Sequence, residues 1–474
     1  MSIKTSHTPV KAAIAPQFDS SLIRRYEGRA PRYTSYPTAM QFSESVGNDQ
    51  YRVAVNTSNE LFIPHPLSLY VHIPFCDTIC YYCACNKVVT ANRDRVREYV
   101  ELLLREIEIQ AKLYDVDREI VQMHFGGGTP LFLDSGQFDV AIDALDRHFS
   151  LSTRSDRDFA IELDPSNTQV KDIYHLTSLG FNRFSIGVQD LDEKVQKAVN
   201  RKQSLEQIQA VVEACRNAGA HSVNIDLIYG LPHQTTARFS ATVGTVLEKL
   251  QPDRLSIFKY AHLPAWFKSQ RHIDAADLPS PAKKMKILET SIRALVSAGY
   301  VHIGMNHFAL RSDSLVVALN SGTLQRNFQG YSTHGNCDLL GLGVSAISNL
   351  GGGIFQNAID LKQYSVRIQQ GDLAVDRGVI LSEEDRIRAE IIQQLMCYHQ
   401  FSAVTIESLF AIDFKKAFSW ELQQLKKMQQ DGLLVHDRDV WSVTARGRLL
   451  IRSICAVFDA YQQPQTATGF SRLV

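Results

Sequence analysis

The chain has 474 residues, of which 45% are hydrophobic and 21% are charged, and this length suggests two or three globular domains. Its 50 basic and 50 acidic side chains cancel to a formal net charge of zero. This balance argues against nucleic acid or an acidic membrane surface as a partner and favours small-molecule chemistry. The first 21 residues are polar and lack the apolar core of a secretory signal, so we expect a soluble, cytoplasmic protein.

Residues 1–55 are predicted to form an N-terminal arm. Within it, residues 1–20 are predicted to be disordered, and the arginine- and tyrosine-rich stretch 24–36 is predicted to be ordered but irregular. Two interpretations stay open for this stretch. It is either a strap along the surface or a lid that brings arginines to an acidic substrate.

From residue 67 onward, short apolar segments alternate with amphipathic helical patterns, which predicts parallel strands in a barrel-like sheet over residues 56–360. Strands this apolar are expected to be buried on both faces. In such folds the chemistry gathers at the C-terminal ends of the strands. The predicted strands are 67–75, 121–126, 159–164, 183–189, 222–229 and 254–260, and the helices between them include 95–113, 137–148, 170–179 and 205–218.

The chain beyond residue 260 changes character. A helix at 284–298 and a short strand at 301–305 are predicted, followed by a loop-rich, apolar stretch at 321–353. The uncharged stretch 339–359 is long enough to span a bilayer, but its five glycines and its polar residues favour buried backbone. Residues 361–474 are predicted to form a mostly helical domain with helices 383–399, 414–430 and 444–461 and a hairpin at 433–443, an order that resembles a winged-helix unit.

Four of the eight cysteines lie in the segment Cys76-Asp-Thr-Ile-Cys80-Tyr-Tyr-Cys83-Ala-Cys85, directly after the first predicted strand. Such clustering is unlike a disulfide framework and is typical of a metal site in a reducing compartment. Thiols spaced C-x3-C-x2-C can wrap one face of a four-iron cube and leave one iron open to a small molecule. Cys85 is left as a fourth ligand, a zinc ligand or a thiol facing the active site. A zinc site built from all four thiols is less favoured, because zinc sites usually recruit two separated ligand pairs.

A glycine-rich turn, Gly126-Gly-Gly-Thr-Pro130, follows the second predicted strand, and glycine lets the backbone approach a ligand closely. A second glycine pattern, Gly341-Leu-Gly343, imitates a dinucleotide fingerprint but lacks the strand–helix setting that such a site requires. Polar or small residues also stand at the ends of other predicted strands, and these are Glu162, Gln189, Asp226 and Ala261.

The cysteine spacing together with the Gly-Gly-Thr-Pro turn resembles the signature of radical S-adenosylmethionine (SAM) enzymes. From about residue 22 to residue 474, the chain resembles the family of oxygen-independent coproporphyrinogen III oxidases. The segments that carry this resemblance are RYTSYPTA (32–39), LYVHIPFC (69–76), CNKVVT (85–90), GFNRFSIGVQD (180–190), NIDLIYGLP (224–232), YAHLP (260–264), RNFQGY (326–331), LLGLGVSAIS (339–348) and GRLLIR (447–452).

The resemblance implies an α/β fold, with a partial (β/α)6 radical SAM barrel, an N-terminal arm and a C-terminal, mostly helical, winged-helix-like domain. It implies oxidative decarboxylation of two propionates of coproporphyrinogen III to vinyl groups, giving protoporphyrinogen IX. The implied cofactors are a 4Fe-4S cluster and two SAM molecules, one of which is cleaved to a 5′-deoxyadenosyl radical. A reduced flavodoxin- or ferredoxin-type protein would donate the electron, and we expect a monomer without nucleic-acid or membrane partners.

The resemblance also assigns residues. Cys76, Cys80 and Cys83 would hold the cluster, whereas Cys85 and Gln329 would line the reaction space as catalytic candidates. One SAM would contact Tyr70, Gly127, Glu162 and Ile347, and the other would contact Tyr82, Gly128, Thr129, Gln189, Arg201, Asp226 and Ala261. As a hypothesis of our own, the substrate propionates would be neutralised by Arg24, Arg25, Arg29 and Arg32.

Three positions depart from the family pattern. Asn306 stands where Asp is usual, Lys259 replaces a neutral amide, and Tyr82 replaces a common Phe. The exchange at Asn306 keeps a second interpretation open, a diverged paralogue that carries haem or porphyrin without turnover. A zinc-dependent regulator that binds DNA through its tail is a third, weaker interpretation, because the tail lacks a strong basic stripe.

Overall fold

The structure is a computed structural model that describes residues 15–26, 28 and 30–462. The chain divides into two compact units. We call Phe42–Ile287 with Asn336–Ile380 the barrel unit, and Met1–Gln41 with Leu288–Gly335 and Leu381–Val474 the terminal unit. The division predicted from the sequence, with boundaries at residues 55 and 360, remains a proposal. Most of the predicted disordered segment lies outside the described residues.

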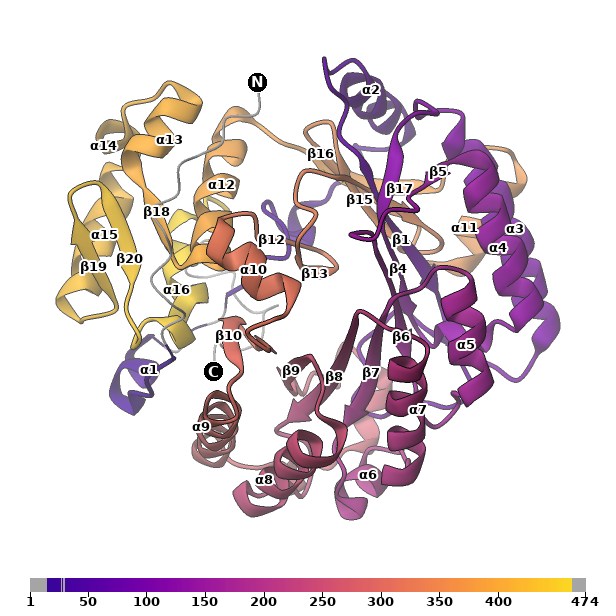
Figure 1. Cartoon of the computed structure of the whole chain (residues 1–474). Helices are drawn as coiled ribbons and strands as arrows, with labels where there is room; N and C mark the ends of the chain where they lie inside the picture. The colour runs from indigo at the N-terminus through magenta and orange to yellow at the C-terminus, as the bar shows by residue number, and fades with distance from the viewer. Residues whose placement is uncertain (1–14, 27, 29, 463–474) are drawn as a thin grey trace. The chain divides into compact units, whose positions relative to one another are not determined.

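The barrel unit is built on a curved sheet whose parallel strands follow the order β9-β8-β7-β6-β4-β1-β14, with β14 at Asp338–Leu342 (Figure 1). The six strands predicted from alternating apolar segments are present, each within two residues of its expected ends. Short strand β5 (Ser150–Leu151) pairs with the start of β4. The bounds are β1 Leu67–Ile73, β4 Glu119–Gly127, β6 Asp158–Leu163, β7 Arg183–Gln189, β8 Ser222–Tyr229 and β9 Arg254–Lys259.

Helices cover the outer face of this sheet (Figure 1). Several begin at a side chain that accepts backbone N–H bonds, including Asn92, Asp134 and Ser204, so their starts are encoded locally. Their apolar stripes pack against the strands. The bounds are α2 Asn48–Asn59, α3 Arg93–Ala111, α4 Ser135–His148, α5 Val170–Ser178, α6 Glu193–Ala198, α7 Leu205–Asn217, α8 Thr236–Thr245 and α11 Leu361–Gln369.

The expectation that the strands are buried on both faces is wrong for β7 and β8. Both strands alternate between buried and half-buried residues. Phe184, Ile186 and Val188 are buried, whereas Ser185 and Gln189 are only partly covered. The reason is that the second face of these strands lines an open, polar pocket instead of a second apolar layer.

Residues 338–357 form strands that the sequence reasoning treated as loop-rich backbone. Strand β14 (Asp338–Leu342) pairs in parallel with β1, and the sheet then continues through antiparallel β15 (Ile347–Leu350), β16 (Gly353–Asn357) and β17 (Val375–Ile380). The expected burial is confirmed, since every residue of β14 and of β16 is buried. Their glycines and short lengths hide the strand pattern, which only the pairing with distant segments stabilises.

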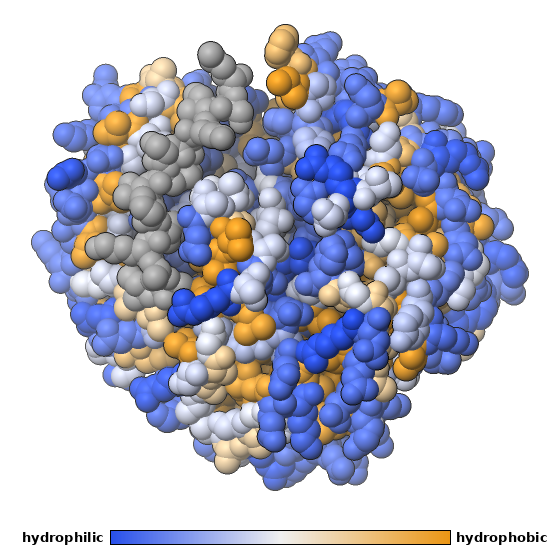
Figure 2. All heavy atoms as spheres, in the orientation of Figure 1, coloured by the Kyte–Doolittle hydropathy of each residue, from blue (hydrophilic) through white to orange (hydrophobic). Residues whose placement is uncertain are grey.

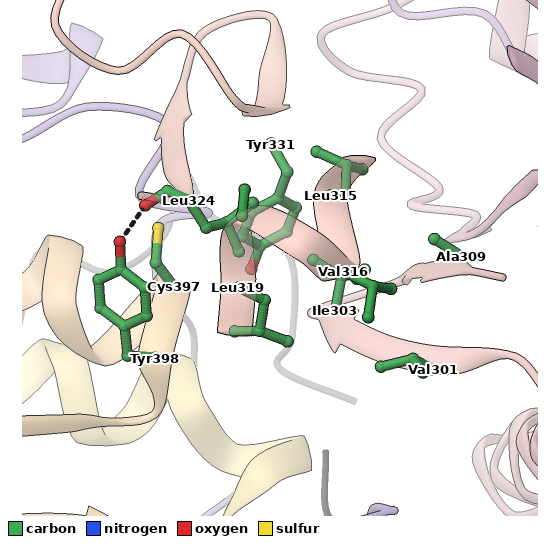
Figure 3. Packing of buried hydrophobic residues seen from close by; sticks show 11 residues of the cluster. Val301, Ile303, Ala309, Leu315, Val316, Leu319, Leu324, Tyr331, Cys397 and Tyr398 are labelled. Carbon is green, nitrogen blue, oxygen red and sulfur yellow. Dashed lines mark hydrogen bonds between the residues drawn. The ribbon is translucent and has the colours of Figure 1, made fainter. Parts of the chain in front are cut away.

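The terminal unit combines helices with small sheets. Helix α9 (Pro281–Ser297) leads into the hairpin of β10 (Val301–Gly304) and β11 (His307–Ala309), helix α10 (Ser314–Ser321) and the hairpin of β12 (Gln325–Asn327) and β13 (Gly330–Ser332). Apolar residues between Val301 and Tyr331 pack with Cys397 and Tyr398 at the end of α12 (Glu383–Tyr398) (Figure 3). The Tyr398 hydroxyl donates to the carbonyl of Leu324 at 2.6 Å, which ties α12 to this cluster.

The C-terminal part of this unit confirms the helix at 383–399 and the hairpin at 433–443. They are α12 (Glu383–Tyr398) and β19 (Leu434–Asp437) with β20 (Val440–Val443), to which β18 (Gln400–Ser402) adds. Helix α13 (Ala403–Phe410) lies between them in the chain.

Three details of the terminal unit differ from expectation. The helix predicted at 414–430 is divided into α14 (Phe414–Ala417) and α15 (Ser419–Gln430), because buried Phe418 leaves helical geometry and packs on Phe414 and Phe458. The predicted helix 444–461 is reduced to α16 (Ile451–Cys455) with flanking 3₁₀ turns. The first three residues of the stretch 24–36, which was expected to be irregular, belong to α1 (Ser20–Tyr26).

No helix within residues 15–26, 28 and 30–462 is long and apolar enough to cross a membrane. Hydrophobic and hydrophilic residues are intermixed on the molecular face shown in Figure 2.

Candidate active site at the strand ends

The cysteine segment is a loop fastened at both ends. It leaves β2 (Phe75–Cys76) and returns in β3 (Val88–Val89), which pairs with β2 in parallel. The N–H of Thr90 donates to the carbonyl of Cys76 at 3.1 Å. Inside the loop, the N–H of Cys83 donates to the carbonyl of Cys80 at 3.1 Å, and Lys87 Nζ donates to the Cys83 carbonyl at 3.1 Å. These bonds give the loop a defined shape.

The loop forms one wall of a pocket whose empty volume, including its open mouth, is about 800 Å³. The other walls come from the C-terminal ends of β4, β6, β7 and β8, as the parallel strand order leads us to expect. Most of the residues singled out from the sequence lie together here, namely Cys76, Cys80, Tyr82, Cys83, Cys85, Gly127, Gly128, Thr129, Glu162, Gln189, Arg201 and Asp226.

The glycine turn is joined directly to the strand that carries the first cysteine. The N–H groups of Gly128 and Thr129 donate to the carbonyls of Ile73 and Phe75, each at 2.8 Å. A Cβ atom on Gly128 would lie only 2.6 Å from the Phe75 carbonyl oxygen. Gly127 has a φ of +115°, where L side chains are strained, and a Cβ there would meet the ring of His72 at 2.6 Å. Both positions therefore require glycine.

Glu162 stands at the end of β6 as a carboxylate held by two donors. The N–H of Gly127 donates to Oε2 at 3.1 Å, and His124 Nε2 lies 3.2 Å from Oε1. Burial alone would raise the pKa of Glu162, but the hydrogen bonds from His124 and Gly127 lower it below its usual value. The group is thus a fixed negative charge beside the glycine turn.

Arg201 supplies a buried positive charge to the pocket. Its Nη1 contacts Asp164 at 2.9 Å and the Cys80 sulfur at 3.6 Å, and Nη2 donates to the Gly187 carbonyl at 2.6 Å. Burial opposes this charge, but Tyr82, Asp164 and Cys80 hold the pKa of Arg201 above its usual value. Its Nε atom is buried without a hydrogen-bond partner.

Asp226 within β8 and Gln189 at the end of β7 provide oxygen acceptors. Ser185 Oγ and Asn224 Nδ2 donate to the two carboxylate oxygens of Asp226 at 2.9 and 2.8 Å, while burial raises the pKa of this carboxyl. Gln189 has a φ of +65°, and its Oε1 is buried without a hydrogen-bond partner. Unsatisfied buried groups of this kind indicate a ligand that completes them.

The four thiols differ in environment. Burial raises the pKa of Cys76 to about 11, against a hydrogen bond from Thr129 Oγ1 at 3.7 Å. A thiol hydrogen bond between Cys85 and Cys83 lowers the pKa of Cys83 to about 6 and raises that of Cys85. Cys83 and Cys85 therefore influence each other's ionisation.

The donor set fits an iron–sulfur cube better than a lone ion. Among the residues that the structure describes, no group of three or more His, Cys, Asp and Glu side chains could hold a metal ion. A cube binds each thiolate through a different iron, so its ligands stand further apart than those of one ion. Thiols on one loop beside a glycine cradle and two unsatisfied polar groups fit a cluster with a polar organic ligand.

The remaining predicted residues do not line this pocket. The ring of Tyr70 stacks on His124 at 5.9 Å, so Tyr70 adjoins the pocket through a neighbour of Glu162. Ile347 begins β15, and its carbonyl oxygen lies 2.7 Å from where a Cβ on Gly341 would stand. Ala261 is the second residue after β9, and Gln329 belongs to the terminal unit, in the turn between β12 and β13.

Several residues that shape the pocket were missed in the sequence. Asn224 was detectable, because on β8 it shares a face with Asp226 two positions later. His124 lies on the apolar strand β4, where a histidine is ordinarily a core residue. Lys87 and Asp164 carry no sequence signal, since their importance depends on contacts with Cys83 and Arg201 that only the fold creates.

Comparison with known proteins adds independent findings. Residues 70–246 match the radical SAM superfamily, and residues 381–450 match the HemN C-terminal domain. An oxygen-independent coproporphyrinogen III oxidase of Pseudomonas aeruginosa is 48% identical over 458 residues, covering 97% of this chain and 99% of that protein. The protein of the same name from Escherichia coli is 44% identical over 458 residues, covering 96% and 98%. A solved structure of the Escherichia coli coproporphyrinogen III oxidase, described as a radical SAM enzyme, has a TM-score of 0.89 and covers 94% of this chain and 100% of that chain.

Proposed function

The chain belongs to the family of oxygen-independent coproporphyrinogen III oxidases, and from this membership we propose how its residues carry out the reaction. The protein is a radical SAM oxidoreductase of anaerobic haem biosynthesis. It converts two propionate side chains of coproporphyrinogen III to vinyl groups by oxidative decarboxylation, which gives protoporphyrinogen IX. The observation that carries this conclusion is the 48% identity over 97% of the chain, with the cysteine loop and the glycine turn intact.

The cofactors are a 4Fe-4S cluster and SAM, which when bound supply the radical that starts the oxidation of the propionate. Cys76, Cys80 and Cys83 are proposed to hold the cluster, one thiolate for each of three irons. Cys85 is proposed to remain a thiol that faces the reaction space. The hydrogen bonds at both ends of the loop keep these thiols at the pocket wall.

The polar groups of the pocket are proposed to orient SAM. The Gly127 and Gly128 backbone comes close enough to meet its amino acid end, and Arg201 has a free Nε for its carboxylate. Glu162, ionised and fixed by His124, accepts from hydroxyl or ammonium groups. That two SAM molecules bind, one at Tyr70, Gly127, Glu162 and Ile347 and the other at Tyr82, Gly128, Thr129, Gln189, Arg201, Asp226 and Ala261, is part of this proposal.

Gln329 is proposed as a second residue of the reaction space. The turn that carries it is ordered by a hydrogen bond from its N–H to Asn327 Oδ1 at 2.9 Å. Coproporphyrinogen III is the substrate, while the electron donor of flavodoxin or ferredoxin type, the monomeric state and the cytoplasmic location are further parts of the proposal.

The arm is tied into the terminal unit, which supports the strap interpretation for most of it. Arg25 pairs with Asp431 at 2.6 Å, and the Tyr33 hydroxyl donates to Asp459 at 3.0 Å. Arg24 and Arg32 are exposed, and Arg29 lies outside the described residues. The substrate-neutralising role of Arg24, Arg25 and Arg32 stays a proposal.

One experiment tests the function. The cluster is reconstituted anaerobically, and the enzyme receives reductant, SAM and coproporphyrinogen III, with Cys83→Ser as the matched control. We expect protoporphyrinogen IX and 5′-deoxyadenosine from the wild type and neither from the variant. Deoxyadenosine without vinyl product would instead support a diverged porphyrin carrier, an alternative that the family comparison does not favour. Stoichiometric zinc without iron–sulfur absorption would contradict the radical chemistry.

A further inference from the structure

Two arginines of the terminal unit are buried without an acidic partner. Arg326 in β12 is 8% exposed, and Arg448 is 4% exposed. Within the described part of the chain, Nε and Nη1 of both arginines lack a hydrogen-bond partner, and neither arginine has an ion pair. Arg388 of the same unit shows the ordinary arrangement, because it is equally buried and pairs with Glu384 at 2.8 Å and Glu421 at 2.9 Å. Burying a guanidinium without a partner costs free energy, so the unpaired arrangement requires an explanation.

The two arginines share a neighbour, Tyr331. Arg326 and Tyr331 are partners across the β12–β13 hairpin, and the guanidinium carbon lies 4.8 Å above the tyrosine ring. Burial raises the pKa of Tyr331, and the charges of Arg326 and Arg448 both oppose this rise. The Tyr331 hydroxyl donates to the Met396 carbonyl at 2.9 Å. Tyr331 belongs to the packed cluster of Figure 3, so the position of this ring is well defined. The hairpin therefore presents its buried charge from a rigid support.

Nearby titratable groups do not compensate this charge. Burial lowers the pKa of Arg448 itself to about 10. Burial and the Arg448 charge lower the pKa of His399 far below its usual value. The same two causes lower the pKa of His302 to about 4. Both imidazoles are thus neutral near pH 7 and add no negative charge.

The unsatisfied atoms are predominantly donors. Besides the four arginine nitrogens, Nδ2 of Asn306 is buried without a partner, and the adjacent His307 ring packs edge-on against Tyr331 at 5.3 Å. Nδ1 of His302 and Nε2 of His399 are also buried without a partner, but the donors outnumber them. This excess of donors favours a ligand rich in acceptor oxygens. The planar fork of a guanidinium matches a carboxylate in particular, because both nitrogens can bind both oxygens.

We propose that Arg326 and Arg448 form a carboxylate site that holds one of the substrate propionates left intact by the reaction. The proposal rests on the proposed function, which supplies the ligand. Coproporphyrinogen III carries four propionates, of which only two are decarboxylated, so two carboxylates persist throughout turnover and need partners. The hairpin that bears Arg326 also bears Gln329 in its turn, the residue already proposed for the reaction space.

The test compares Arg326→Gln and Arg448→Gln with Arg388→Gln, a control in which an equally buried but paired arginine is changed. Binding is measured by the fluorescence of coproporphyrin III, the oxidised form with the same four carboxylates, and by KM for coproporphyrinogen III. Loss of charge-assisted hydrogen bonds should weaken binding about 10- to 100-fold in the first two variants. The control should lose thermal stability and keep its affinity.

Further measurements separate a ligand site from a structural role. Without ligand, Arg326→Gln and Arg448→Gln should unfold at the same temperature as the wild type or higher, because an unpaired charge has been removed. The tetramethyl ester of coproporphyrin III should bind wild type and variants equally. If Arg448→Gln does not fold, Arg326→Lys, which keeps the charge but loses the fork, should still weaken binding. Unchanged affinity for coproporphyrin III in folded Arg326 variants would overturn the proposal. A wild type that makes no vinyl product, yet binds coproporphyrin III through these arginines, would refute the proposed function and leave the site standing.

Discussion

Glu106 on α3 provides a sensitive test of the physical reasoning about the barrel. Its side chain is fully buried and accepts hydrogen bonds from the N–H of Gly343 at 2.6 Å, from the Tyr364 hydroxyl at 2.8 Å and from Asn357 Nδ2 at 2.7 Å. These bonds fix the turn between β14 and β15. Burial nevertheless dominates, because it raises the pKa of Glu106 from 4.5 to about 7.

The direction of the pH effect follows from this pKa. In the folded protein the carboxyl keeps its proton up to about pH 7, whereas in the unfolded chain it loses the proton above pH 4.5. Its contribution to stability is therefore fully present below pH 4.5, declines as the pH rises and is lost above pH 7. The difference between the two pKa values corresponds to about 3 kcal/mol of unfolding free energy.

The assay measures the unfolding free energy of wild type and Glu106→Gln by urea titration between pH 4.5 and pH 8. The advantage of the wild type over the variant should fall by about 3 kcal/mol across this range, because glutamine does not titrate. Glu101→Gln, an exposed change on the same helix, should show a difference that is constant with pH. A wild-type advantage over Glu106→Gln that stays constant or grows with pH would refute the reasoning.

Three further predictions concern the active site and the arm. Gly128→Ala should cost about 1 to 3 kcal/mol of stability and lower the amount of bound iron, because its Cβ would lie 2.6 Å from a backbone oxygen. The control Gly136→Ala in α4 should be neutral or stabilising, because its Cβ would meet no atom closer than 3.5 Å. Cys85→Ser should keep the iron–sulfur absorption and lose vinyl formation, while Cys83→Ser should lose the absorption itself; equal absorption loss in both would make Cys85 a ligand. Arg32→Ala should weaken substrate binding while SAM cleavage survives, and an unchanged KM would remove Arg32 from the substrate site.

Local patterns account for the part of the fold that was predictable. Strands β7 and β8 have the predicted ends, since alternation of apolar and polar residues marks a strand without knowledge of its partners. Strand β14 was missed because it is stabilised by pairing with β1. Its first residue, Asp338, pairs with Leu67, which lies far away in the sequence. The break at Phe418 was also invisible, since only the packing of its ring on Phe458 explains it.

The same limit applies to the site. The C-terminal ends of parallel strands lie at one edge of the sheet, and this rule was sufficient to predict that Glu162 and Asp226 lie in one pocket. Their partners Asn224 and His124 required strand register, and the Asp164–Arg201 pair required the full tertiary structure. The buried Arg326 carries no sequence signal at all, because arginine in a short hairpin is ordinarily a surface residue.

The backbone geometry after β1 and β4 fixes the position of the first cysteine relative to the glycine turn. The backbone bonds from Gly128 to Ile73 and from Thr129 to Phe75 join the glycine turn to the segment that ends in Cys76. Thr129 Oγ1 also reaches the Cys76 sulfur at 3.7 Å. The first cysteine and the cradle of its neighbouring ligand therefore move as one body with β1 and β4.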